Sequence, residues 1–347
     1  MKARLDSNNF DACPHYNDWL DEQYSEQYGL LDIVGFQPRP SFVLFQMSPD
    51  TYEAAFADYI AQHENELKQT VFDQFPSPIA HYFYRFENGY ENDLQRLYLL
   101  RDVWEAVIDI LHAATVAECQ FRGIQMTDPV SFSHFLSESV AQKLLNIERV
   151  MTLAAGIGQT LSVAQLVSIP ALQTMRELNQ SRNAFSHSAA QSEAQAREWI
   201  SECYEDVVEV LYELRGLADI EILRYIGQVN GRTMRCEVFV GHSFTRTIRS
   251  FVLTDAQIRD SSRYLQQGQI LIIYGGFLFG LRPLIFFRED SSGHVTKLCM
   301  FRKTHGDAPN RFLEYEVVGE STRWAQERVL FKVEIDELRS LFGLGPD

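Results

Sequence analysis

The sequence predicts an α+β protein, in which an N-terminal all-helical region is followed by a β-rich C-terminal domain. Up to Gly216, apolar residues recur at the three- and four-residue spacing of helices that face a core. After Gly216, short runs of β-branched and aromatic residues alternate with turn residues. A chain of 347 residues is long enough for two or three domains. We predict three parts: an N-terminal arm and helix (1–88), a helical bundle (89–217) and a β-rich module (218–347).

The first part is expected to be an irregular arm that leads into one helix. Aromatic side chains should anchor the arm to the rest of the protein: Tyr16, Trp19, Tyr24 and Tyr28. Pro49 suits the first position of a helix, and Asp50 places an acid in its first turn. We expect this helix to end near Phe72, before the proline-containing run at 75–78.

The helical bundle contains the clearest helix of the chain, with Asn92 as its cap and Gly123 at its end. Its apolar stripe is Leu97, Leu100, Val103, Trp104, Val107, Ile108, Leu111 and Ala114. Two more helices are predicted, one from Asp128-Pro129 through Ile147 and one from Leu166 to His187. The capping box at 192–195 predicts a last helix, which ends at Gly216.

The C-terminal module is predicted to form a small barrel or sandwich of short strands. The expected strand runs are Cys236–Val240, Thr247–Leu253, Ile270–Tyr274, Phe277–Phe287, Val295–Phe301 and Phe312–Val318. Asn230-Gly231 and the stretch at 291–293 are typical of hairpin turns.

Charge is distributed unevenly along the chain. Residues 1–218 contain 14 Lys+Arg against 31 Asp+Glu, a net charge of −17, whereas residues 219–347 contain 17 against 16, a net charge of +1. An acidic front half disfavours broad binding of nucleic acid, although it allows a small site that cuts a presented strand.

Other features of the composition exclude several classes of protein. The five cysteines are dispersed without a Cys-x-x-Cys pair, so neither a disulfide framework nor a cysteine zinc site is expected. No metal-binding motif, phosphate loop or other cofactor fingerprint is present, so we expect neither a metal nor a cofactor. No apolar run reaches the ~20 residues of a membrane span, and no signal peptide is recognisable, which predicts a cytoplasmic protein without a membrane partner.

An arginine followed at short spacing by a histidine occurs three times: Arg182…His187, Arg235…His242 and Arg288…His294. The spacing alone is expected about twice by chance, so the context decides. Only Arg182 lies among predicted helices, and only Arg182 is followed by an asparagine. Asn183 and His187 are four residues apart and would share one helical face.

The segment from Glu177 to Ser188, ELNQSRNAFSHS, resembles the motif of the HEPN family. That family has an arginine, a polar residue and a histidine five positions after the arginine, followed by a long last helix. The array of helices from about 92 to 216 is similar to the family's bundle. The run FPSPIA at 75–80, with Tyr84-Arg85, also resembles an element that precedes such domains in some bacterial defence-type proteins.

The resemblance implies a metal-independent RNA endonuclease that leaves 2′,3′-cyclic phosphates and serves as a regulated stress, toxin-type or phage-defence effector. His187 would move protons, Arg182 would bind and stabilise the phosphate, and Asn183 would orient the imidazole or bind a phosphate oxygen. In the family, two motifs meet across a homodimer formed by the helical domain. A regulatory protein partner is also expected.

Alternatives to catalysis remain open. The chain could be a catalytically inert HEPN scaffold that dimerises and binds partners, or the match could be accidental, with Arg182 paired to an acid. Some HEPN toxins carry a tyrosine two residues after the histidine, which their antitoxin modifies. Ser188, Ala189 and Ala190 stand here instead, so that mode of control is not supported.

A second, weaker candidate surface lies in the β-rich module. It comprises four basic residues near phenylalanines, which would bind single-stranded RNA by charge and stacking: Arg246, Arg249, Arg302 and Lys303. These residues could equally belong to a solvated strand face or dock on the acidic N-terminal half, and we favour this structural interpretation.

Overall fold

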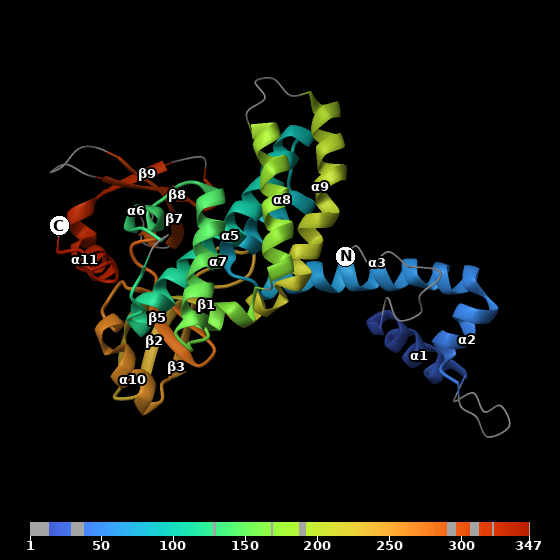
Figure 1. The fold of residues 1–347 in the computed structure, drawn as a ribbon, viewed down its shortest axis with the longest axis horizontal. Coiled ribbons are helices and arrows are strands. Elements are labelled where there is room, and N and C mark those ends of the chain that lie inside the picture. Colours follow the sequence, from blue (N-terminus) through green and yellow to red (C-terminus); the bar gives the residue numbers. More distant parts are fainter. Residues whose placement is uncertain are drawn as a thin grey trace. The chain divides into compact units, whose positions relative to one another are not determined.

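The computed structural model describes residues 14–28, 38–127, 130–167, 169–186, 192–289, 296–305, 312–320 and 323–346. Helices dominate the N-terminal part, and antiparallel sheets follow in the C-terminal part, as the sequence predicts (Figure 1). The chain divides into two compact units, Met1–Gln69 and Thr70–Asp347. The second unit therefore contains both the helices and the strands on either side of the predicted boundary at 217.

The first unit contains helices where an irregular arm was expected. They are α1 (Pro14–Tyr28), α2 (Pro40–Met47) and the greater part of α3 (Pro49–Gln74). Three of the aromatic residues predicted as anchors, Tyr16, Trp19 and Tyr24, explain the difference, because they pack on α3 rather than along an extended arm. Tyr16 is buried against Tyr52 and Tyr59, with ring centroids 4.9 and 5.3 Å apart. Arg39, directly before α2, bonds Asp18 and Asp21 of α1 at 2.5 Å.

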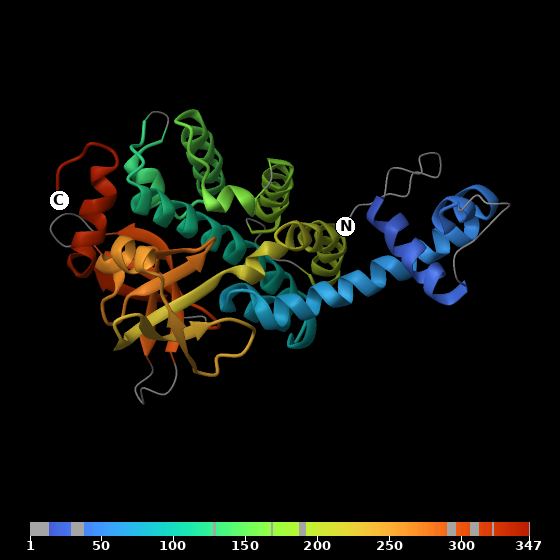
Figure 2. The same ribbon diagram turned by 90° about the horizontal axis from the view of Figure 1, so that it is seen from below.

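The second unit is built around one long helix, α5. Its helices and helical turns are α4 (Ser77–Asn88), α5 (Asp93–Arg122), α6 (Phe132–Phe135), α7 (Val140–Gly156), η2 (Ser162–Gln165), α8 (Ile169–Ser186), α9 (Glu193–Glu213), η3 (Arg215–Asp219), α10 (Asp255–Ser261), η4 (Ser262–Tyr264), η5 (Arg328–Phe331) and α11 (Lys332–Ser340). Asn92 caps α5 through a bond from the backbone N–H of Gln95, and Gly123 ends it in the left-handed conformation, as predicted. Figure 2 shows α5 between the other helices and the sheets, and it is therefore buried on nearly every side from Ala106 to Gln120.

One predicted helix of the bundle is interrupted. The run expected from Asp128-Pro129 through Ile147 consists of the short α6 and the separate α7, while residues 128–129 lie outside the described chain. Ser139 caps α7 by accepting a bond from the backbone N–H of Gln142. The intervening Ser137 and Ser139 compete locally for backbone hydrogen bonds, which favours a break over a continuous helix.

The described strands form two antiparallel sheets. One has the order β3-β2-β1-β4-β5 and the other the order β6-β7-β8-β9. The strands are β1 (Glu221–Asn230), β2 (Thr233–Phe239), β3 (Thr247–Val252), β4 (Ile270–Tyr274), β5 (Phe277–Gly280), β6 (Ile285–Glu289), β7 (Thr296–His305), β8 (Phe312–Val317) and β9 (Arg323–Glu327). Asn230-Gly231 does turn the chain from β1 to β2, where Asn230 pairs with Thr233, whereas the predicted turn at 291–293 lies outside the described residues.

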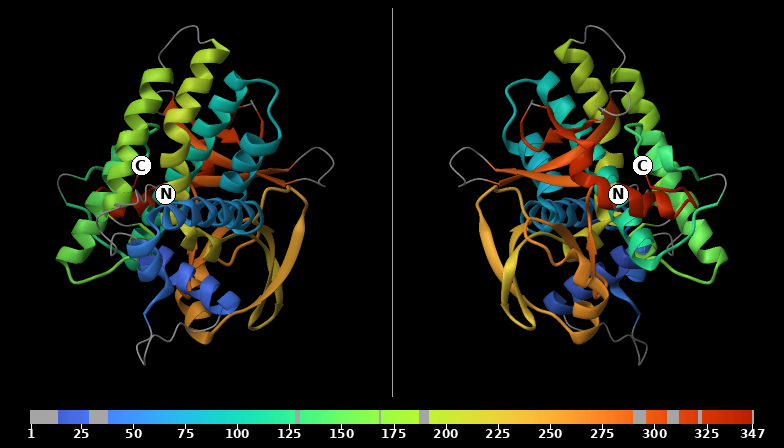
Figure 3. Two further views of the ribbon diagram at one scale, coloured as in Figure 1. Left: turned by 90° about the vertical axis from the view of Figure 1, so that its right-hand side faces the viewer. Right: turned by 90° about the vertical axis from the view of Figure 1, so that its left-hand side faces the viewer.

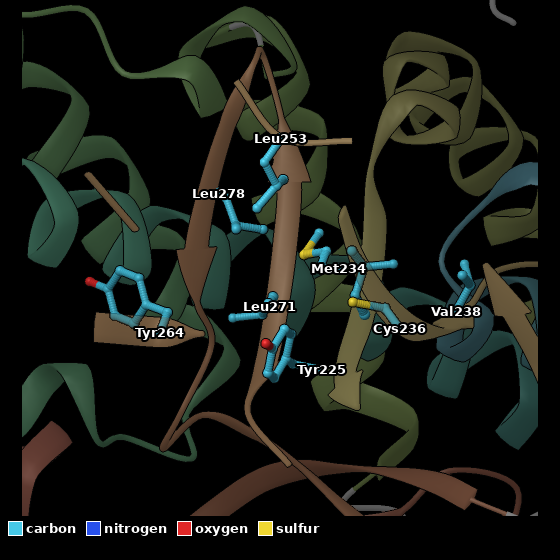
Figure 4. Packing of buried hydrophobic residues seen from close by; sticks show 9 residues of the cluster. Tyr225, Met234, Cys236, Val238, Leu253, Tyr264, Leu271 and Leu278 are labelled. Atoms are coloured by element: carbon cyan, nitrogen blue, oxygen red, sulfur yellow. The ribbon is translucent and has the colours of Figure 1, made fainter. Parts of the chain in front are cut away.

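The run from Phe277 to Phe287, predicted as one strand, is divided between the two sheets. β5 ends at Gly280 and β6 begins at Ile285. Pro283 lies between them and has no N–H to donate to a ladder, so a continuous strand cannot form. The core of the first sheet is apolar and includes Leu223, Met234, Cys236, Leu271 and Leu278 (Figure 4).

The segment FPSPIA connects the helices to the first sheet. Pro76 forms a bridge with Val240, and the backbone N–H of Gly241 donates to the carbonyl of Phe75 at 2.8 Å. Gly241 has φ of +74°, and an added Cβ would lie 3.2 Å from two backbone oxygens of α3. These contacts hold the segment before α4 against the end of β2, although the two are far apart in the sequence.

Candidate functional site

The predicted catalytic motif lies at the C-terminal end of α8. The structure describes the backbone of Arg182 and Asn183, which occupy the last turns of that helix. His187 follows Ser186 directly and lies outside the described residues. Ser192, which the sequence predicted as a cap, accepts a bond from the backbone N–H of Gln195 and begins α9.

Helices α8 and α9 stand side by side (Figure 3). Arg182 and Asn183 lie in the last turns of α8. Their apolar faces are buried and include Leu172 and Met175 on α8 and Ile200 and Val207 on α9. Near the start of α9, Arg197 bonds Asp93 at 2.7 Å, which places this part of α9 beside the start of α5. The end of α8 and the starts of α5 and α9 thus converge on one end of the bundle.

A buried amide lies one helical turn before the motif. Asn179 is 6% exposed, and its side-chain oxygen has no hydrogen-bond partner among the described residues. Residues four apart share a helical face, so Asn179 and Asn183 lie on the same side of α8. Buried polar atoms are normally satisfied, which makes Asn179 a candidate for positioning the motif. Sequence reasoning missed it, although a polar residue within the apolar spacing of α8 is a usable signal.

The competing arginine–histidine spacings have different surroundings. His242 stacks on Tyr84 with ring centroids 4.0 Å apart, and its Nδ1 lies 3.0 Å from the carbonyl of Phe72. It therefore helps to hold α4 on the first sheet. Arg288 lies on β6 and pairs with Glu320 at 3.4 Å, while His294 lies outside the described residues.

The four basic residues of the weaker RNA surface do not form one open patch. Arg249 bonds Glu221 at 2.5 Å, and Arg246 lies 3.7 Å from Glu237. Lys303 is partly buried on β7. Arg302 bonds Asp109 of helix α5. This is the structural role that the sequence analysis favoured for these residues. We retain Arg246, Arg249 and Lys303 as candidates for RNA contact.

Arg302 belongs to a buried charge network between β7 and the helices. Its Nη1 lies 2.7 Å from Oδ2 of Asp109, and its Nε donates to Glu316 at 2.9 Å. Burial alone would lower the pKa of Arg302, but the carboxylates of Asp109, Glu316 and Glu105 raise it above its usual value. The other oxygen of Asp109 bonds Lys143 of α7, which is 2% exposed. Asp109 therefore joins α5, α7 and the second sheet.

A buried histidine lies on the same face of α5. His112 is 2% exposed, and its Nε2 is 3.1 Å from the amide nitrogen of Asn146. Burial, together with the charge of Lys143, lowers the pKa of His112 to about 3, so the ring is neutral near pH 7. The adjoining cavity of about 10 Å³, which Asp109, His112 and Lys143 help to line, has room for about one water molecule. This cluster is too enclosed for a substrate, and we interpret it as structural.

The described cysteines show no sign of reactivity. Cys119, Cys203, Cys236 and Cys299 are buried, and no disulfide joins them. Burial raises the pKa of Cys236 and of Cys299 to about 12, so both remain thiols near neutral pH. In the part of the chain that the structure describes, no three His, Cys, Asp or Glu side chains are grouped as a metal site would require. None of the described helices is both long and apolar enough to cross a membrane.

Comparison with known proteins supplied no relative. The chain matched no protein-family profile, no curated protein and no solved structure.

Proposed function

We propose that this protein is a metal-independent RNA endonuclease of the HEPN type, with Arg182, Asn183 and His187 as its catalytic residues. The observation that supports the proposal most is the position of the motif. Arg182 and Asn183 lie at the end of α8, which packs on α9, and the start of α9 is paired with the start of α5. Of the three arginine–histidine spacings, this one alone is carried by the helical bundle.

The proposed chemistry uses the 2′-hydroxyl of RNA as the nucleophile. His187 transfers protons, and Arg182 binds the phosphate with its fork of N–H donors and stabilises the charge that develops there. Asn183 orients the imidazole or binds a phosphate oxygen. Products with 2′,3′-cyclic phosphate ends follow from this chemistry, and DNA is not cleaved because it lacks the 2′-hydroxyl.

The proposed setting is the cytoplasm, as a regulated effector of stress or phage defence that responds to a protein partner. This setting comes from the family resemblance. The second candidate function is an inert HEPN scaffold that dimerises and binds partners. It is favoured by the acidic surroundings of the motif, since Asp93 and Glu193 lie in the first turns of α5 and α9.

Chelation of metals is expected to leave RNA cleavage unchanged. The reaction should proceed equally in EDTA and in magnesium, because all its groups come from side chains and from the substrate. The measurement is cleavage of labelled RNA, with end analysis for the cyclic phosphate. An RNA with 2′-deoxy substitution at the cut position is the matched control and should remain intact. Cleavage that requires a metal, or that cuts the deoxy control, would contradict the proposal.

We propose a homodimer formed through the helical domain as the working unit. One motif supplies one arginine and one histidine, whereas in-line cleavage needs a proton acceptor, a proton donor and positive charge on the phosphorane. Two motifs related by a two-fold axis would meet this need, and such dimers are the commonest oligomers.

Light scattering should give twice the mass of one chain, and specific activity should fall on dilution through the range where the dimer dissociates. The control is a mixture of a His187→Ala chain with an Arg182→Ala chain, which should regain part of the activity if the two motifs form composite sites. Full activity in a protein that is monomeric at every concentration would refute the dimer but not the nuclease.

A further inference from the structure

A polar cavity of about 250 Å³ lies at the opposite end of α5 from the motif. It opens to solvent and is lined by the end of α5, by η4, by the end of β5 and by the start of α11. Its charged and amide lining groups are Gln120, Arg263, Gln269, Arg282, Glu334 and Glu337. Neither the proposed chemistry nor the fold requires these groups to surround an open space.

The charged groups of this cavity are held in place by the protein. Gln269 donates to Glu334 at 3.2 Å, and Gln120 donates to Glu337. Both amides are more than nine-tenths buried. The two arginines are held by backbone carbonyls. Nη2 of Arg282 donates to the carbonyl of Gly268 at 2.8 Å, and Nη2 of Arg263 donates to the carbonyl of Gln120 at 3.2 Å. The carboxylates and guanidiniums are therefore oriented before any ligand arrives.

The two acid–base pairs across the cavity are long ion pairs. The nearest atoms of Arg263 and Glu337 are 3.7 Å apart, and those of Arg282 and Glu334 are 3.8 Å apart. Both distances exceed those of a hydrogen bond. Each pair thus has an arginine that can donate and a carboxylate that can accept.

The charge of the lining restricts the class of ligand. Two arginines and two glutamates sum to zero, so a phosphate would meet two carboxylates and a divalent cation would meet two guanidiniums. Two apolar side chains lie at the cavity, Leu330 and Val333, and they are 50% and 68% exposed. A ligand with an apolar portion would cover them.

We propose that this cavity binds a small ligand of zero net charge that offers an acceptor to an arginine and a donor to a glutamate. A free α-amino acid does so with its carboxylate and ammonium groups. A guanine base does so with O6 and N7 on one edge and its N–H groups on the next. Both carry an apolar or flat portion that can rest on Leu330 and Val333.

The cavity is separate from the proposed nuclease site. Asp93 contacts the start of α9, near the motif, whereas Gln120 lines the cavity. The helix between them spans ~40 Å at roughly 1.5 Å per residue. Binding in the cavity therefore does not depend on cleavage, and it can be tested whether or not the protein cleaves RNA.

Isothermal titration of the full chain with guanosine and, separately, with each free α-amino acid that has an apolar side chain tests the proposal. At least one of these probes should bind, whereas inorganic phosphate and Mg²⁺ should not. Binding of guanosine would identify a guanine compound as the ligand, and binding of an amino acid would identify an amino acid. Glu337→Gln and Arg263→Gln should each weaken that binding at least tenfold, because each removes one charge of the pair between Arg263 and Glu337. The side chains of Arg263 and Glu337 are 43% and 34% exposed, so the variants should fold.

The matched control is Arg259→Gln, since Arg259 lies four residues before Arg263 on the surface and pairs with Asp260. It should bind as tightly as the unaltered chain. Unliganded melting temperatures of all three variants report whether they fold. Failure of every amino acid and of guanosine to bind would overturn the proposal. So would undiminished binding by folded Glu337→Gln and Arg263→Gln, or binding of phosphate at the same residues.

Discussion

Replacing His187 with alanine is expected to abolish RNA cleavage. General acid–base catalysis by a positioned histidine contributes about 10²–10⁴-fold to a rate, so the residual activity should fall by at least that factor. The loss should be the same in EDTA and in magnesium. The measurement is the single-turnover rate of cleavage of a labelled RNA, with excess enzyme so that binding does not limit the rate.

Two further variants separate catalysis from structure. Gln180→Ala changes an exposed residue on the same helix and should keep full activity. Arg182→Lys retains the charge but loses the bidentate fork, so it should lower the rate of cleavage more than it lowers the affinity for RNA. The unfolding midpoint of His187→Ala should match that of Gln180→Ala. If His187→Ala still cleaves RNA at the original rate, the assignment of His187 as a catalytic residue fails. If the unaltered chain does not cleave RNA at all, the inert-scaffold alternative is favoured.

Replacing Asp109 with asparagine is expected to destabilise the second unit severely. The change removes the shared partner of Lys143, which is buried, and of Arg302, whose side chain is 12% exposed. Removal of one member of a buried ion pair leaves an uncompensated charge and costs about 3–5 kcal/mol. The free energy of unfolding from urea titration, compared between the variant and the unaltered chain, gives this cost directly.

A matched control is Asp260→Asn, which breaks an exposed pair with Arg259. Its unfolding midpoint should be nearly unchanged, because solvent screens exposed pairs. A double variant with Asp109→Asn and Lys143→Met should recover part of the lost stability, since it removes the cation whose ion-pair partner is lost, whereas Arg302 still pairs with Glu316. If Asp109→Asn unfolds at the same urea concentration as the control, the network does not join the helices to the second sheet.

Local sequence signals were sufficient for the elements that depend on near neighbours. Asn92 and Gly123 begin and end α5 as predicted, and Ser192 caps α9. Ile270–Tyr274 is a strand within its predicted limits. Capping, chain reversal and apolar periodicity involve residues a few positions apart, and such interactions can be recognised from the sequence itself.

Elements that depend on distant partners were missed. α1 and α2 form where an arm was expected because their aromatic residues pack on α3. β1 was not anticipated, although it is the central strand of its sheet, because its burial comes from β2 and β4 on either side. The cavity near α11 is of the same kind, since its walls come from segments more than 200 residues apart in the chain, such as Gln120 and Glu337.

The sequence by itself determined the α+β order of the chain, the limits of its longest helix and the motif at Arg182, Asn183 and His187. The tertiary structure alone decided what the charged residues do. The sequence does not indicate that Arg302 and Asp109 form a pair. They meet because α5 is covered by helices on one side and by sheets on the other. A charge is solvated or buried according to what packs on it, and that packing depends on the whole chain.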